Sequence, residues 1–203
     1  VATTKLSQFV TGRYAPSDAW QTVWRWILQW ACPDIAVSEL TVMPVVRPTY
    51  AADEALQGDA ELDAAQRGVS WFRNAKLFIH PVWQDEAKRR VATYPDGTGP
   101  GPDAGWPCGD GSCGMIEGAS SRIHPDGTQD WRYFVRADCV GEASMAMASA
   151  WALSGDAGAG EIAANLNDFI YTHSVCAKGP RANPTSPSYG LISWTTTPPA
   201  DGV

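Results

Sequence analysis

Apolar residues recur at helical spacing in several stretches of this 203-residue chain. The first stretch lies between Ser17, a suitable N-cap, and Pro33, which a helix cannot easily continue through. A second helix is predicted at 59–78, with apolar residues along one face. Further helices are predicted at 139–153 and 160–173, on either side of a Ser-Gly-Asp turn. This spacing indicates an antiparallel helical hairpin.

A different pattern precedes the helical hairpin. Segments with β-branched and aromatic residues flank Pro-Asp-Gly-Thr at 125–128, which is typical of a tight turn between two strands. The sequence therefore predicts a two-stranded β-hairpin here, but it leaves the register open. A four-residue loop would place Glu117 opposite Arg136, where the two can form a salt bridge, whereas a three-residue loop would place Glu117 opposite Val135.

Segments without helical or strand periodicity divide the chain. Residues 42–61 are rich in proline and small residues and indicate a linker, so a domain edge is expected near residue 50. Residues 1–50, which begin with an expected short strand at 1–10, are interpreted as the C-terminal tail of a preceding α/β domain plus this linker. Residues 51–203 are interpreted as the N-terminal part of a helical domain.

The two long loops and the chain ends add further expectations. The loops at 93–114 and 176–190 are rich in glycine and proline, and the first is expected to bury no apolar face of its own. The chain begins without an initiator methionine and ends without completing a helix or strand, so we expect a segment of a longer polypeptide. The broad apolar helix faces then predict exposed apolar patches and self-association of the isolated segment.

Charge and hydropathy narrow the range of partners. The net charge is −7, and the 15 lysine and arginine residues are scattered rather than clustered. This balance argues against a nucleic-acid partner, which requires a basic surface. No apolar run approaches the roughly 20 residues of a membrane span, and the first residues lack the pattern of a signal peptide. The cellular location is left undetermined.

The chain contains 5 cysteines, an odd number that leaves at least one unpaired. Cys108 and Cys113 lie in the glycine-rich segment Trp-Pro-Cys-Gly-Asp-Gly-Ser-Cys-Gly and could be free thiols, a local disulfide or metal ligands. We expect no cofactor, and no metal in the candidate site. The segment lacks the lysine and following helix of a phosphate-binding loop.

A group of charged residues stands at the start of the predicted helix at 139–153. Asp138 is expected to be its N-cap, and Glu142 lies one helical turn later. Two carboxylates exceed what capping requires, so one of them is a candidate acid or base whose pKa should be raised by partial burial. Glu117, on the predicted hairpin, is a third candidate catalytic residue. Serine-hydrolase chemistry is not indicated, because the chain lacks a Gly-x-Ser-x-Gly motif.

The predicted hairpin supplies candidate substrate-binding residues. An arginine and a histidine can hydrogen-bond to a polar or acidic substrate, and two aromatic residues on one strand face can pack on a sugar ring. These residues are Arg136, His124, Trp131 and Tyr133.

The segments RADCVGEASMAMASAWALSGD, IAANLNDFIY and GLISW, within about 112–194, together resemble a helical hairpin of the (α/α) toroid proteins, the six-hairpin glycosidase-like group. That group consists mostly of carbohydrate-active hydrolases, lyases and epimerases with sites in the funnel of the toroid. The resemblance implies a mainly α partial (α/α) toroid with a β-hairpin, and it places Asp138 and Glu142 at the funnel end of a helix. We therefore expect a fragment of a carbohydrate-active enzyme of the glycoside hydrolase type, with a sugar as its partner. The alternative is a non-catalytic helical scaffold or glycan-binding module.

Overall fold

The computed structural model describes most of the chain. The described residues are 17–37, 40, 50, 53–93, 98–124 and 128–196. Contacts divide the chain into two compact units: residues 1–56 with 121–129, and residues 57–120 with 130–203. The expected strand at 1–10, half of the expected linker and most of the expected hairpin turn lie outside the described residues.

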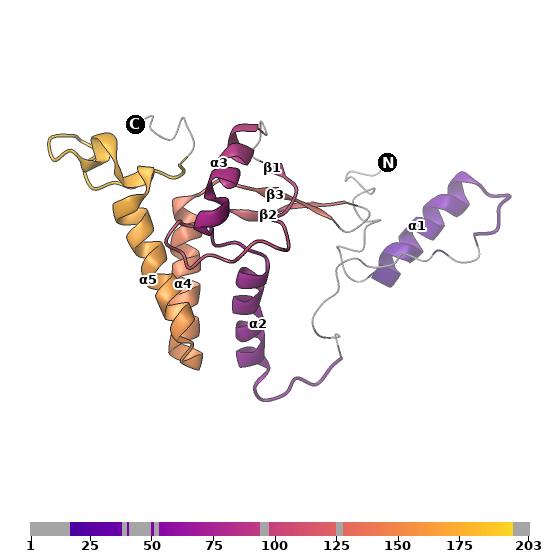
Figure 1. The fold of residues 1–203 in the computed structure, drawn as a ribbon. Helices are drawn as coiled ribbons and strands as arrows, with labels where there is room; N and C mark the ends of the chain where they lie inside the picture. Colours follow the sequence, from indigo (N-terminus) through magenta and orange to yellow (C-terminus); the bar gives the residue numbers. More distant parts are fainter. Residues whose placement is uncertain are drawn as a thin grey trace. The chain divides into compact units, whose positions relative to one another are not determined.

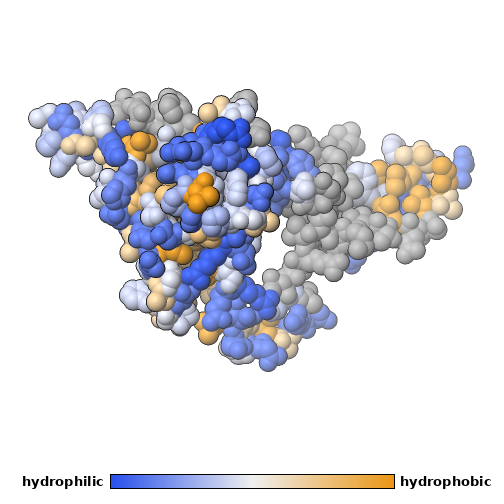
Figure 2. Space-filling model, viewed as in Figure 1, coloured by the Kyte–Doolittle hydropathy of each residue, from blue (hydrophilic) through white to orange (hydrophobic). Residues whose placement is uncertain are grey.

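The first unit contains helix α1, Ser17–Ala31, as the apolar periodicity predicts (Figure 1). The helix ends just before Pro33, with the Cys32 amide bonded to the Leu28 carbonyl at 2.9 Å. Large side chains on α1 stay exposed: Trp26 is 73% and Trp30 is 83% exposed. Figure 2 shows this apolar surface along the helix.

The second unit is mainly helical. Its α-helices are α2 (Ala60–Asn74), α3 (Gln84–Thr93), α4 (Ala137–Ser154) and α5 (Ala157–Asp168). α4 and α5 pack side by side, and α2 contacts α4 (Figure 1). The prediction of a mainly α fold with a small antiparallel sheet is confirmed at this level. Among the described residues, no helix has the length and apolar character needed to cross a membrane.

The predicted helical hairpin is present as α4 and α5. α4 ends at Gly155, whose φ of 71° is the left-handed conformation that glycine adopts without strain. Asp156 caps α5 by accepting a hydrogen bond from the Ala159 amide at 3.1 Å. Between the helices, the buried Ser144 hydroxyl donates to the Ala163 carbonyl at 2.9 Å and accepts from the side-chain Nδ2 of Asn167 at 2.9 Å. Both helices begin earlier than predicted: α4 follows Arg136 and α5 follows Asp156, and both positions lie upstream of the apolar periodicity.

α2 ends at Asn74, short of the predicted residue 78. Lys76 has a φ of 57°, which interrupts the helix. The next residues become a buried extended segment, in which Phe78 is 0% exposed and pairs with Met115. The predicted helix extended too far because this buried extended segment is also apolar, and its residues continue the helical spacing of apolar positions. The short helix α3 follows it, and no sequence pattern above predicts that helix.

A three-stranded antiparallel sheet contains the expected two-stranded hairpin and adds a third strand to it. Its strands are β1 (Thr98–Gly99), β2 (Gly118–Ile123) and β3 (Gln129–Arg132), in the order β1-β3-β2. β1 comes from the expected long loop and pairs Gly99 with Trp131. The Glu117 amide donates to the Phe134 carbonyl at 2.8 Å, so Glu117 faces neither Arg136 nor Val135 along the backbone.

The loop between β1 and β2 packs against the core through buried glycines. Its Gly111 and Gly114 are buried with positive φ, and a Cβ on Gly111 would lie 2.9 Å from the Ile162 carbonyl of α5. The Asn165 side chain of α5 donates to the Asp110 carbonyl at 3.0 Å. Glycine lets this loop approach a helix closely, so the loop needs no large side chains to be buried.

The final described segment contains no α-helix, as its prolines predict. α5 continues into a π-helical turn, Phe169–His173, followed by 3-10 turns at Val175–Ala177 and Gly179–Ala182. The chain then returns to the start of α4, where Thr195 pairs with Arg136. This return brings the last described residues next to the candidate site.

Candidate functional site

The start of α4 carries Asp138, but Asp138 is not the N-cap. Arg136 occupies the cap position with an extended backbone, φ −117° and ψ 140°, and its side chain makes no capping hydrogen bond. Asp138 is the second helical residue, and its side chain is 47% exposed. One carboxylate oxygen, Oδ1, accepts from the Cys139 amide at 2.9 Å. The other, Oδ2, accepts from the indole Nε1 of Trp194 at 3.2 Å.

The surroundings of Asp138 favour its ionised form. Burial acts to raise the pKa of this carboxyl, but the Trp194 and Cys139 hydrogen bonds and the Arg136 charge outweigh burial and leave the pKa below its usual value. Asp138 is therefore ionised at neutral pH. It suits the role of a base or a charge-stabilising group, and the expectation of a raised pKa is wrong for this residue.

Glu117 lies between two arginines rather than on an open surface. Its Oε1 is 2.8 Å from Nη1 of Arg132 and 2.9 Å from Nη1 of Arg136, and its side chain is only 16% exposed. The salt bridge to Arg136 thus forms, although the backbone register differs from the one that would place these residues opposite each other. A carboxylate bonded to two guanidiniums is held in one position, so Glu117 is suited to fixing Arg136.

Arg136 links this ion pair to the exposed aromatic residue of the site. Its guanidinium lies 4.0 Å from the ring centroid of Trp194 and 4.0 Å from Asp138. A cation stacked on an indole at this distance is attracted by the ring's negative face. The Ala137 amide also donates to the Trp194 carbonyl at 2.8 Å, so both the backbone and the side chain of Trp194 are anchored.

Trp194 is the site residue that the sequence did not identify. Its side chain is 58% exposed although its ring contacts Arg136 and its nitrogen contacts Asp138. The sequence places it 56 positions from Asp138. Its only signal was the segment GLISW, which belongs to the resemblance but gave this tryptophan no role.

Glu142 lies exposed on α4, one turn after Asp138. Helical residues four positions apart have Cβ atoms about 5–6 Å from each other, so the two carboxylates share one side of the helix start. The expected pair of neighbouring acidic groups is therefore present in the structure, with Asp138 hydrogen-bonded by Trp194 and Glu142 open to solvent.

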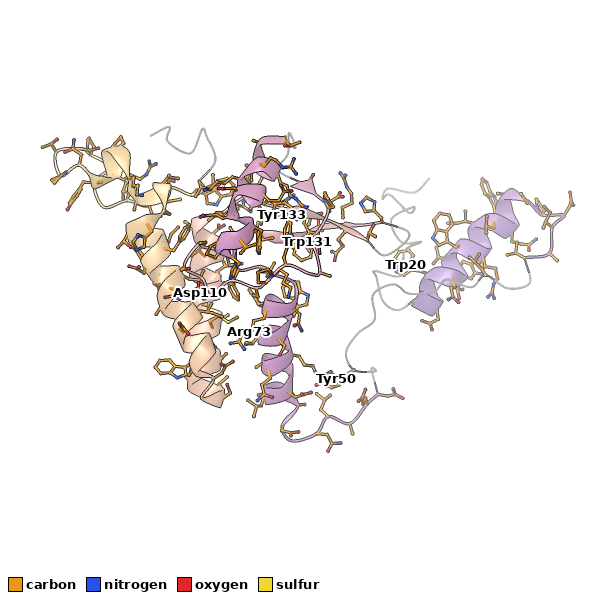
Figure 3. The ribbon with its side chains drawn as sticks, viewed as in Figure 1. Trp20, Tyr50, Arg73, Asp110, Trp131 and Tyr133 are labelled. Carbon is orange, nitrogen blue, oxygen red and sulfur yellow. The ribbon has the colours of Figure 1, made fainter. Side chains whose placement is uncertain are left out.

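The predicted sugar-binding residues of the hairpin differ in burial and in the contact unit to which they belong. Tyr133 is 1% exposed, and its hydroxyl donates to the Pro100 carbonyl at 2.6 Å, so it cannot present its ring to a sugar (Figure 3). Trp131 is half-buried, and its indole covers Gly101, where an added Cβ would lie 2.9 Å from Nε1. His124 belongs to the first contact unit, whereas Asp138 belongs to the second.

The cysteines are all free thiols, which agrees with one of the three alternatives for Cys108 and Cys113. Burial raises the pKa of Cys108. Burial and the neighbouring carboxylates of Asp138 and Glu117 raise the pKa of Cys139 to about 11, so its thiol stays protonated and is a poor nucleophile. Within the described parts of the chain, no group of three or more histidine, cysteine, aspartate or glutamate side chains could hold a metal ion.

Comparisons with protein families, with curated proteins and with solved structures found no match to this chain. The resemblance to the (α/α) toroid proteins therefore stays a prediction.

Proposed function

We propose that this chain is part of a carbohydrate-active enzyme of the (α/α) toroid type, and that the start of α4 binds a sugar. The observation that supports this most directly is the pairing of an ionised, half-exposed carboxylate, Asp138, with an exposed indole, Trp194. Sugars have an apolar face that packs on an aromatic ring and hydroxyl groups that donate to carboxylates. Here the aromatic ring and the carboxylate are joined directly, by the hydrogen bond from Trp194 to Asp138.

Asp138 and Glu142 take the two carboxyl roles in this proposal. Asp138 serves as the base or nucleophile, because its lowered pKa keeps it ionised. Glu142, the other carboxyl one helical turn away, takes the second acid–base role. Enzymes that retain configuration hold these two groups about 5–5.5 Å apart, a separation that neighbouring turns of one helix can provide.

Glu117 and Arg136 support the site without entering the reaction. Glu117 fixes Arg136 at 2.9 Å, and Arg136 in turn lies against the face of Trp194. This arrangement holds the indole in place before a ligand arrives, which lowers the ordering cost of binding.

The test is a pair of amide variants in the full-length protein, assayed on a panel of 4-nitrophenyl α- and β-glycosides. Asp138→Asn and Glu142→Gln should each lower turnover by at least about 100-fold, in the range seen when acid–base groups are removed. Their free energies of unfolding should change by no more than about 1 kcal/mol, because both side chains are solvent-accessible. Glu161→Gln, at an exposed carboxyl on α5, is the matched control and should leave turnover unchanged.

The opposite result would assign the charges to architecture. If Asp138→Asn lowers stability by about 1 kcal/mol while turnover stays at the wild-type level, the acid–base proposal fails.

A non-catalytic glycan-binding module or scaffold is the second candidate. It is favoured by the fact that both Asp138 oxygens already accept hydrogen bonds within the protein. Sugar binding without turnover, lost in Trp194→Ala, would identify a binding module. Neither binding nor turnover, with normal folding, would identify a scaffold.

A further inference from the structure

A separate pocket of 470 Å³ lies in the second unit, between α3 and the end of α5. Its walls are mostly apolar and include Val91, Val135 and Phe169. Val135 faces this pocket, whereas its neighbour Arg136 contacts Glu117 and Trp194. Successive residues of an extended segment point to opposite faces, so the pocket is distinct from the site at the start of α4.

An unusual backbone feature shapes one wall of the pocket. The turn Phe169–His173 is π-helical, and the Ser174 amide donates to the Phe169 carbonyl at 2.7 Å, five residues back. Phe169 and His173 both line the pocket. π-helical turns are rare and occur frequently at functional sites.

The polar residues of the lining include a lysine and a histidine on separate elements. Lys88 comes from α3 and His173 from the π-helical turn. Lys88 contacts Asp85 at 3.2 Å, and Asp85 is 97% exposed. His173 contacts Asp168 at 2.8 Å, and both of these side chains are more than half exposed. Exposed contacts of this kind contribute little to stability, so a ligand's anionic group can replace the protein carboxylates at small cost.

We propose that this pocket binds a small molecule with a flat apolar body and one carboxylate group. The apolar body lies against Phe169 and Val91, and the carboxylate lies toward Lys88 and His173. The pocket volume is within the range of known small-molecule sites, which combine apolar walls with a few polar groups that orient the ligand. This proposal is independent of the proposed function at the start of α4.

The test compares three probes that share one ring system: 2-naphthoate, its neutral carboxamide and its cationic methylamine analogue. Each is titrated into the full chain while the methyl signals of Ile79, Val91 and Val135 are followed by NMR. We expect saturable shifts at these methyl groups and an affinity for naphthoate at least tenfold above that for the amine. Absence of shifts up to 1 mM, a concentration typical of weak ligands, would refute the site. Equal affinities for the three probes would refute the carboxylate preference.

Two variants localise the interaction. Val91→Trp fills the pocket and should weaken naphthoate binding at least tenfold, and Lys88→Glu should abolish the preference for the anion. Lys178→Glu changes the same charge at an exposed lysine outside the lining and is the matched control. If Val91→Trp does not fold, as judged by circular dichroism, the wild-type methyl shifts still decide the location. Unchanged binding in folded Val91→Trp, or an equal loss in Lys178→Glu, would overturn the proposal.

Discussion

Replacing Glu117 by glutamine tests whether one carboxylate holds the start of α4 together. The change keeps the shape of the side chain but leaves a neutral amide facing the guanidiniums of Arg132 and Arg136, now at 2.8 and 2.9 Å from the carboxylate. A fully exposed pair contributes about 0–1 kcal/mol, and breaking a fully buried pair costs about 3–5 kcal/mol. Glu117 is 16% exposed and Arg136 22%, so an intermediate loss of about 2 kcal/mol is expected.

The assay is urea unfolding at pH 7, extended to double-mutant cycles with Arg132→Gln and Arg136→Gln. The coupling of Glu117 to Arg136 should exceed that to Arg132, because Arg132 is 43% exposed and better screened by solvent. Asp63→Asn, in an exposed pair with Arg67, is the matched control and should cost less than about 0.5 kcal/mol. A loss in Glu117→Gln no larger than in this control would show that the cluster has no structural role.

Further predictions concern backbone fit, pH and association. Gly114→Ala should lower the free energy of unfolding by more than about 2 kcal/mol, because φ is 77° and the new Cβ would lie 2.5 Å from the Phe169 ring. Gly141→Ala on α4, where a new Cβ would meet nothing within 4 Å, should raise the free energy of unfolding by about 0.5–1 kcal/mol. Hydrogen bonds from two arginines lower the pKa of Glu86 to about 2, so its stabilising contribution is present above the unfolded pKa of about 4.3 and is lost as pH falls toward 2. Glu86→Gln should therefore reduce the acid sensitivity of unfolding, and an unchanged pH profile would contradict this. The apolar side chain of Met145 is 68% exposed on α4, so we expect the chain to self-associate. Sedimentation should depend on concentration, and Met145→Glu should reduce this dependence. Identical sedimentation profiles for both proteins would refute this expectation.

Features that depend on neighbouring residues could be predicted from the sequence. The helical periodicity after Ser17 and on both sides of Gly155 predicted α1 and the α4–α5 hairpin, because one apolar stripe per helix is a local property. The glycine of the Ser-Gly-Asp turn adopts the left-handed conformation that ends α4. The salt bridge between Glu117 and Arg136, in contrast, forms in a register other than the one on which its prediction depended.

Features that depend on distant contacts were decided by the tertiary structure alone. Strand alternation placed Trp131 and Tyr133 on one face, but it could not show that the core covers Tyr133. Asp138 was assigned as the cap, yet its lowered pKa depends on Trp194, which the chain's return brings to the start of α4. Local patterns show which residues tend to be buried or charged, because those tendencies belong to the residues themselves. Which distant segment covers or bonds to them depends on packing of the whole unit, and this packing decides the environment of every candidate site residue.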